Sequence, residues 1–134
     1  MNKLGILFTL VLLTGCAGTV DTVKSWVPSF WDDQQSASII DIRQSALRIQ
    51  CGSDSVADQV AQLQSDLQWF RLYSESKGWQ QRDVLVLIEP IEQTAEDFAS
   101  RIDAGSFSKG YCGIKKRLLV LQTERAASTI LGRF

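Results

Sequence analysis

Apolar side chains recur at helical spacing along the chain from about residue 36 onward. The first stretch has steps of three, four and three residues, which place its apolar side chains on one helix face: Ile39, Ile42, Ala46 and Ile49. After a break at residues 51–54, a second stretch has steps of four and three: Val56, Val60, Leu63, Leu67 and Phe70. Ser53 or Asp54 can cap this second helix, and Lys77-Gly78 is a typical helix end.

The same periodicity predicts two more helices in the second half of the chain. The third extends from about Gln81 to Ala104, and its inward face contains Val84, Leu87, Ile88, Ile91, Ala95, Phe98 and Ile102. Pro90 lies inside this helix and is expected to kink it or to divide it in two. The last helix extends from about Tyr111 to Leu131, and the residues predicted to face inward are Ile114, Leu118, Leu121 and Ile130. Four amphipathic helices with short loops predict an all-α fold, a small antiparallel four-helix bundle over residues 36–134.

The N-terminal residues follow a different pattern. Lys3 is followed by an apolar run over residues 4–13, and Leu-Thr-Gly-Cys occupies residues 13–16. Ten helical residues span about 15 Å, half of the roughly 30 Å hydrocarbon core of a bilayer, so the run is too short for a stable membrane span. A short apolar run after a basic residue is typical of a cleaved signal peptide. An ordinary secretory signal with a chance cysteine is the alternative reading.

This segment resembles the signal peptide of bacterial lipoproteins, whose lipobox ends in a small residue followed by cysteine. The resemblance implies that residues 1–15 are removed and that Cys16 carries the lipid anchor, including acyl chains such as palmitate. Ala17, rather than Asp, follows the cysteine, which in lipoproteins of enteric type implies the periplasmic face of the outer membrane. Residues 16–35 are then expected to form the anchor and tether of the helical domain.

Aromatic residues are concentrated in this tether. Trp26, Phe30 and Trp31 lie 10 to 15 residues after Cys16. Aromatic rings of this kind occupy the membrane interface in many proteins, so these three residues are candidates for a membrane-proximal segment. Alternatively, the segment packs against the bundle as a hydrophobic lid.

The cysteines and the absence of histidine restrict the chemistry of the protein. If Cys16 carries lipid, Cys51 and Cys112 remain, and an oxidising periplasm favours a disulfide between them. The chain has 14 basic and 15 acidic residues, and this balance gives no argument for nucleic-acid binding. It has no histidine, so the commonest general base and metal ligand is missing. Glu92 and Glu96 are the candidate carboxylate pair, but a solvated helix face explains them. We therefore expect no enzyme, no metal, no cofactor and no small-molecule substrate.

A second resemblance concerns the body of the chain. Cys51-Gly52-Ser53-Asp54, then Lys77-Gly78-Trp79, then Cys112 occur in the order found in pilotins of the enterobacterial type. Pilotins are small helical lipoproteins of type II secretion systems that hold a short helix of the secretin. The resemblance implies a protein-binding function, with an envelope protein as partner. The alternative is a structural or phage-exclusion envelope lipoprotein without a secretin partner.

Large apolar residues outside the core stripe are the candidates for the partner-binding site. Trp69, Leu72 and Tyr73 lie off the stripe of the second helix, and Trp79 follows the helix end. So many large side chains on a second face indicate either a wider core or a surface for a partner.

Overall fold

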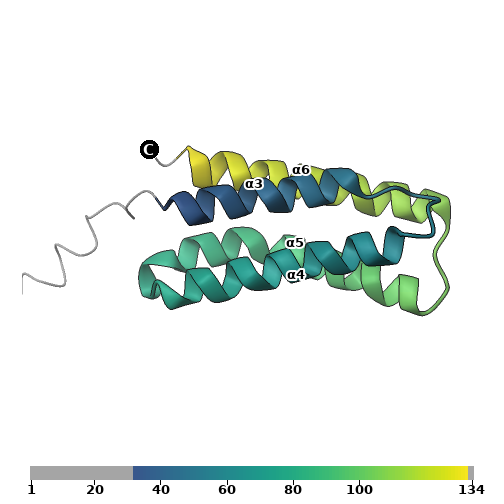
Figure 1. The fold of residues 1–134 in the computed structure, drawn as a ribbon, viewed down its shortest axis with the longest axis horizontal. Helices are drawn as coiled ribbons and strands as arrows, with labels where there is room; N and C mark the ends of the chain where they lie inside the picture. The colour runs from purple at the N-terminus through teal and green to yellow at the C-terminus, as the bar shows by residue number, and fades with distance from the viewer. Residues whose placement is uncertain (1–31, 133–134) are drawn as a thin grey trace, which may run out of the picture. The chain divides into compact units, whose positions relative to one another are not determined.

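The computed structural model describes residues 32–132, which form four α-helices and one short 3-10 helix (Figure 1). With the labels of Figure 1, the elements are α3 (Asp33–Arg48), α4 (Val56–Ser76), η2 (Trp79–Gln81), α5 (Arg82–Asp103) and α6 (Lys109–Leu131). Residues 32–132 contain no β-strand. The predicted all-α fold with four long helices is confirmed.

The four helices are arranged as a bundle in which each helix contacts two others. The neighbouring pairs are α3–α4, α4–α5, α5–α6 and α6–α3, and within the described residues no Cα atoms of α3 and α5, or of α4 and α6, lie within 8 Å of each other. Short connections between consecutive helices make neighbours antiparallel (Figure 1). The α3–α4 side of the bundle therefore lies opposite the α5–α6 side.

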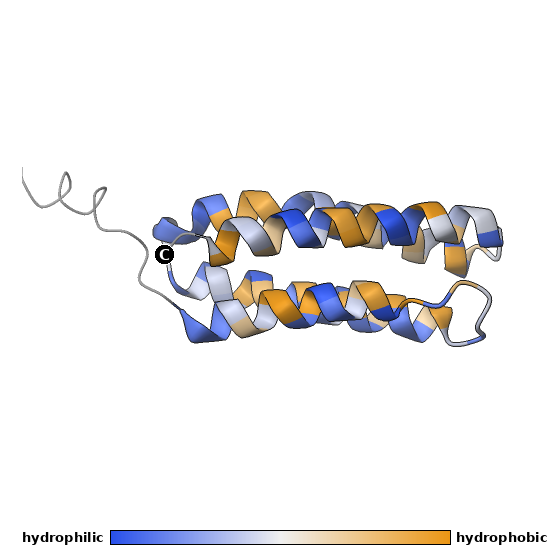
Figure 2. Ribbon diagram, turned by 90° about the horizontal axis from the view of Figure 1, so that it is seen from above, coloured by the Kyte–Doolittle hydropathy of each residue, from blue (hydrophilic) through white to orange (hydrophobic). Residues whose placement is uncertain are grey.

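The core consists of the apolar stripes that face the centre of the bundle. Hydrophobic residues recur along each helix between hydrophilic ones (Figure 2), which is the pattern of a helix with one buried face. In α3, α4 and α5, nearly all of the residues predicted to face inward are buried, whereas Leu87 and Ile102 are only partly buried. The largest fully buried side chains are Phe70, Phe98, Ile39, Ile42, Ile49, Leu63, Leu67, Ile88, Ile91, Leu119, Val60 and Val84.

The inward face of α6 differs from the prediction. Ile130 is buried as expected, but Ile114, Leu118 and Leu121 are exposed, Ile114 by 67 % and Leu121 by 59 %. The prediction for these three residues is wrong because α6 has two apolar stripes and a different one faces the core. The residues of α6 that are buried instead are Cys112, Leu119, Thr123, Ala126 and Ala127.

The helix ends differ slightly from the predicted ones for local reasons. The α3 helix begins at Asp33, three residues early, because the Asp32 carboxylate caps it. The α4 helix begins at Val56 after Ser55, and neither Ser53 nor Asp54 is its N-cap; the Ser53 hydroxyl instead accepts a hydrogen bond from the Ser55 N–H.

Pro90 neither divides nor ends the third long helix. The α5 helix is continuous from Arg82 to Asp103 with Pro90 inside it. Pro90 has no N–H to donate to the Val86 carbonyl, so the helix loses one backbone hydrogen bond at this point. The Thr94 hydroxyl donates to the Pro90 carbonyl oxygen at 2.8 Å, one turn later, and does not replace the hydrogen bond lost at Val86.

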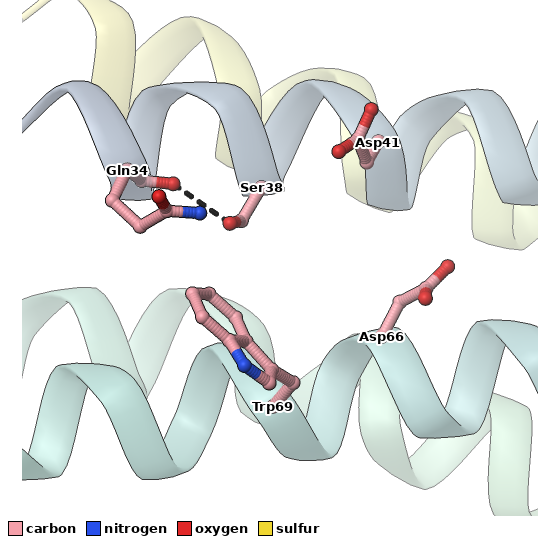
Figure 3. Close-up of a pocket in the computed structure, with 5 residues that line it drawn as sticks. All are labelled: Gln34, Ser38, Asp41, Asp66 and Trp69. Atoms are coloured by element: carbon pink, nitrogen blue, oxygen red, sulfur yellow. Dashed lines mark hydrogen bonds between the residues drawn. The ribbon is translucent and has the colours of Figure 1, made fainter.

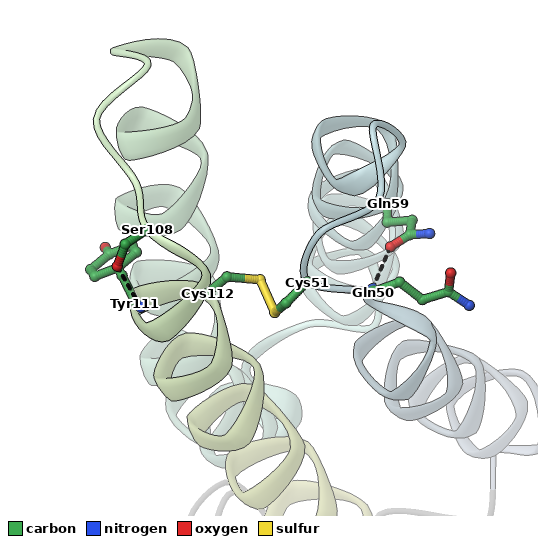
Figure 4. Close-up of a disulfide and its surroundings, with 6 residues drawn as sticks. All are labelled: Gln50, Cys51, Gln59, Ser108, Tyr111 and Cys112. Atoms are coloured by element: carbon green, nitrogen blue, oxygen red, sulfur yellow. Dashed lines mark hydrogen bonds between the residues drawn. A yellow bond between two sulfur atoms is a disulfide. The ribbon is translucent and has the colours of Figure 1, made fainter.

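The predicted disulfide joins the loop after α3 to the first turn of α6 (Figure 4). The Cα atoms of Cys51 and Cys112 are 5.7 Å apart, within the usual range for a disulfide. Beside it, the Gln50 N–H donates to the side-chain oxygen of Gln59 at 2.7 Å, which ties the same loop to α4. The end of the bundle that contains the α3–α4 loop is therefore held both by the disulfide and by this hydrogen bond.

Candidate functional site

A large apolar depression, here called the α5–α6 pocket, lies where η2 and α5 meet the C-terminal half of α6. This pocket has a volume of about 740 Å³, and most of its exposed lining is apolar. Trp79 and Val86 are 60 % and 61 % exposed, so they present hydrophobic surface that the fold leaves uncovered. The lining residues are Trp79, Gln80, Arg82, Asp83, Val86, Leu87 and Thr129.

The turn between α4 and α5 positions Trp79 at this pocket. Gly78 has φ 92°, a left-handed conformation that side-chain-bearing residues rarely adopt, and it allows the chain to reverse directly after α4. The side-chain amide of Gln35 donates to the Ser74 hydroxyl and to the side-chain oxygen of Gln81, both at 3.0 Å. All three polar side chains are buried, so this network fixes η2 against the ends of α3 and α4.

A second, smaller pocket lies between α3 and α4 (Figure 3). Its volume is about 190 Å³, and Trp69 is its one aromatic lining residue, beside Gln34, Ser38, Asp41 and Asp66. Figure 3 shows the Trp69 ring on α4 lying below Gln34 and Ser38 of α3. The polar lining and small size make this pocket a poorer receptor for an apolar segment than the α5–α6 pocket.

The four residues predicted for partner binding are therefore divided between different surfaces. Trp69 stacks on Tyr73 with ring centroids 5.0 Å apart, on the α3–α4 side. Trp79 lies in the α5–α6 pocket, and Leu72 is exposed on α4 and lines neither pocket. Trp69, Leu72 and Trp79 are surface residues rather than parts of a wider core. Sequence analysis missed Val86, although its apolar side chain lies off the inward stripe of α5.

An ion pair occupies Glu92, one of the two acidic side chains that the sequence suggested as a carboxylate pair, and a second ion pair occupies the nearby Asp97. Arg71 of α4 forms a bidentate pair with Glu92 of α5, and the hydrogen bond from Arg71 to Glu92 raises the pKa of the arginine. Lys115 of α6 donates to Asp97 of α5, which lowers the pKa of Asp97 and raises that of Lys115. These pairs link neighbouring helices, α4 to α5 through Glu92 and α5 to α6 through Asp97.

A polar cluster surrounds Asp32, the first described residue. Its carboxylate accepts hydrogen bonds from the backbone N–H groups of Gln34 and Gln35 at 3.0 and 3.2 Å. The Tyr73 hydroxyl donates to it at 3.0 Å, and the Lys77 ammonium lies 3.1 Å away. Burial raises the pKa of Asp32, but the hydrogen bonds from Gln35, Lys77 and Tyr73 outweigh burial and lower the pKa overall.

Replacement of Asp32 is expected to lower stability in a pH-dependent way. Asp32→Ala removes the cap of α3 and should reduce the free energy of unfolding by about 1–2 kcal/mol at pH 7. Because the folded-state pKa of Asp32 is below its unfolded value of 3.8, its contribution is present above that pH and disappears as the pH falls through the folded-state pKa.

Urea denaturation of the wild type and of Asp32→Asn at pH 7 and pH 2 checks this. Asparagine still caps a helix, so Asp32→Asn isolates the carboxylate charge. Its deficit relative to the wild type should be largest at pH 7 and should shrink at pH 2. An equal deficit at both pH values would show that the charge of Asp32 does not stabilise the fold.

The predicted lipid site and the aromatic tether fall outside the described residues. This holds for Cys16 and for Trp26, Phe30 and Trp31. Within the described part of the chain, no helix is long and apolar enough to cross a membrane. Residues 32–132 also contain no group of three or more His, Cys, Asp or Glu side chains that could hold a metal ion.

The fold and the site define a general class, a disulfide-linked four-helix bundle with an apolar pocket on one outer side. Comparison of the chain with protein-family models, curated proteins and solved structures found no match in any of the three. The function is therefore argued from the residues of the chain itself.

Proposed function

We propose that this protein is a lipid-anchored envelope protein that binds an apolar helical segment of a partner protein. The observation that carries the proposal is the α5–α6 pocket, in which Trp79 and Val86 expose apolar surface around a volume of about 740 Å³. This volume is in the range of roughly 300–1,000 Å³ typical of binding pockets. A depression between two helices also suits an amphipathic helix that inserts its apolar face.

The compartment that we propose is the periplasmic face of the outer membrane. The Leu-Thr-Gly-Cys motif at residues 13–16 supports attachment through acyl chains on Cys16. A disulfide between Cys51 and Cys112 agrees with an oxidising compartment. Together these features support a role like that of pilotins, in which an anchored domain holds a helix of an envelope protein without catalysing a reaction.

Site-specific photo-crosslinking in living cells tests this function. A photo-reactive amino acid in place of Val86 is expected to form an adduct with one envelope protein, and the crosslinked partner segment should have a helical apolar pattern. The same amino acid at Gln44, an exposed position of α3, is the matched control and should give no adduct. Cys16→Ala should remove the protein from the membrane fraction and abolish the adduct at position 86.

Two results would contradict the proposal in different ways. An adduct at Trp69 but not at Val86 would show that the partner binds at the pocket between α3 and α4 instead. No adduct at either position, with the protein present and folded, would exclude a stable protein partner for both pockets.

A further inference from the structure

The exposed apolar stripe of α6 leads into the α5–α6 pocket. Ile114, Leu118, Leu121, Arg125 and Thr129 follow one another at steps of four, three, four and four residues, so they lie on one helix face. Thr129 lines the pocket, and Leu118 lies one turn beyond Lys115, which is paired to Asp97 of α5. This face of α6 is apolar from Ile114 to Leu121, continues through Arg125 to Thr129, and is about 22 Å long in all. The pocket and this face together form a surface, here called the α5–α6 groove, that is hollowed at its pocket end and is long enough for a helix of four turns.

The α6 wall of this groove is positively charged, whereas the α5 wall carries both Arg82 and Asp83 at the pocket. The α6 helix contains five basic residues and one acidic residue, although the whole chain has a net charge of −1. Lys115 is paired with Asp97, and Glu124 is paired with Arg43 of α3 at 3.6 Å.

Two arginines remain beside the apolar stripe. Arg117 and Arg125 form no ion pair within residues 32–132. They lie one turn before and one turn after Leu121, so the apolar stripe is bordered by two uncompensated positive charges.

We propose that the α5–α6 groove binds an acidic amphipathic helix. The apolar face of the bound helix covers Val86, Leu118 and Leu121, and the carboxylates of the bound helix pair with Arg117 and Arg125. A helix fits better than a flat bilayer, because a bilayer surface leaves the hollow beside Val86 unfilled. The inference rests on the proposed function and adds the charge of the partner segment. Complementary charge of this kind contributes specificity and faster association.

Two designed peptides of about 18 residues, a length of about 27 Å in a helix, test the inference. Both carry the same leucine stripe, and the flanking positions are glutamate in one and lysine in the other. Binding to the full-length, detergent-solubilised lipoprotein is measured by fluorescence anisotropy. We expect the glutamate peptide to bind at least about tenfold more tightly at low salt, a difference of about 1.4 kcal/mol. The difference should narrow in about 1 M salt, where charges are screened within roughly 3 Å.

Charge reversal in the groove should change this preference. Arg125→Glu is expected to reduce the advantage of the glutamate peptide severalfold, and the double variant Arg117→Glu/Arg125→Glu should favour the lysine peptide. Arg48→Glu is the matched control, because it changes the net charge equally but lies on α3 beside the α3–α4 surface. It should leave both affinities unchanged.

The outcomes separate this inference from the proposed function. Equal binding of both peptides in the groove would overturn the acidic preference and leave the proposed function intact. Binding of neither peptide would overturn both. If only vesicles of phosphatidylglycerol bound the protein in a way that depended on Arg117 and Arg125, the surface would be a membrane contact and the inference would be wrong.

Discussion

A variant in which Cys51 and Cys112 are both alanine is expected to lose about 4 kcal/mol of unfolding free energy. The bond joins residues separated by 61 positions, and in the chain-entropy model a closed loop of that length restricts the unfolded chain by about this amount. A loss of this size is a large part of the roughly 5–15 kcal/mol that stabilises a typical domain. The effect should appear as a lower urea midpoint.

The disulfide prediction is checked in a Cys16→Ala background, so that Cys51 and Cys112 are the only cysteines. Reductant should lower the stability of the parent protein to near that of the double alanine variant and should leave the variant unchanged. Hydrogen exchange should show the greatest loss of protection at the loop end, where the bond joins the segment after α3 to α6. If the oxidised parent and the double variant unfolded at the same urea concentration, the bond would contribute nothing measurable.

Three of the four helices could be predicted well because in each of them one apolar stripe continues along nearly the whole helix. In α4, the steps of four and three from Val56 to Phe70 allow one inward face, and that face is buried. The position of Pro90 in a continuous helix was less predictable. Periodicity shows that both halves of α5 are helical, but whether the chain tolerates a missing backbone hydrogen bond depends on how the helix packs.

The α6 helix could not be oriented by periodicity alone because its apolar residues form two stripes. The larger side chains favoured Ile114, Leu118 and Leu121, whereas the core accepts a stripe rich in small residues. The disulfide determines which of the two stripes faces the core. Cys112 must face Cys51, and Leu119 lies seven residues, or nearly two turns, after Cys112 on the same face. Combining the cysteine pair with the helical period would have identified the inward stripe.

The candidate site was predicted only in part. Trp79 was recognisable as a large apolar residue outside the core stripes, but its neighbours come from α5 and α6 and depend on the turn at Gly78. Trp69 and Tyr73 were recognised in the same way, yet they face the α3–α4 side. Sequence analysis can therefore find exposed apolar residues, whereas their grouping into a surface depends on which helices are neighbours.

A pair of leucine variants tests the orientation of α6 directly. Leu119→Ala is expected to reduce the free energy of unfolding by about 3 kcal/mol, because it leaves a cavity at a fully buried position. Leu121→Ala removes the same atoms from an exposed position and should change stability by less than about 0.5 kcal/mol. Urea denaturation measures both, and circular dichroism confirms equal helix content.

The same two variants distinguish an effect on stability from an effect on peptide binding. If the α5–α6 groove receives a helix, Leu121→Ala should weaken binding of the glutamate peptide severalfold while the domain remains stable, because Leu121 lies at the centre of the exposed stripe. Leu119→Ala should lower stability and leave the affinity of the folded protein nearly unchanged. A larger loss of stability in Leu121→Ala than in Leu119→Ala would mean that α6 is turned the other way in solution, and the groove would then not exist.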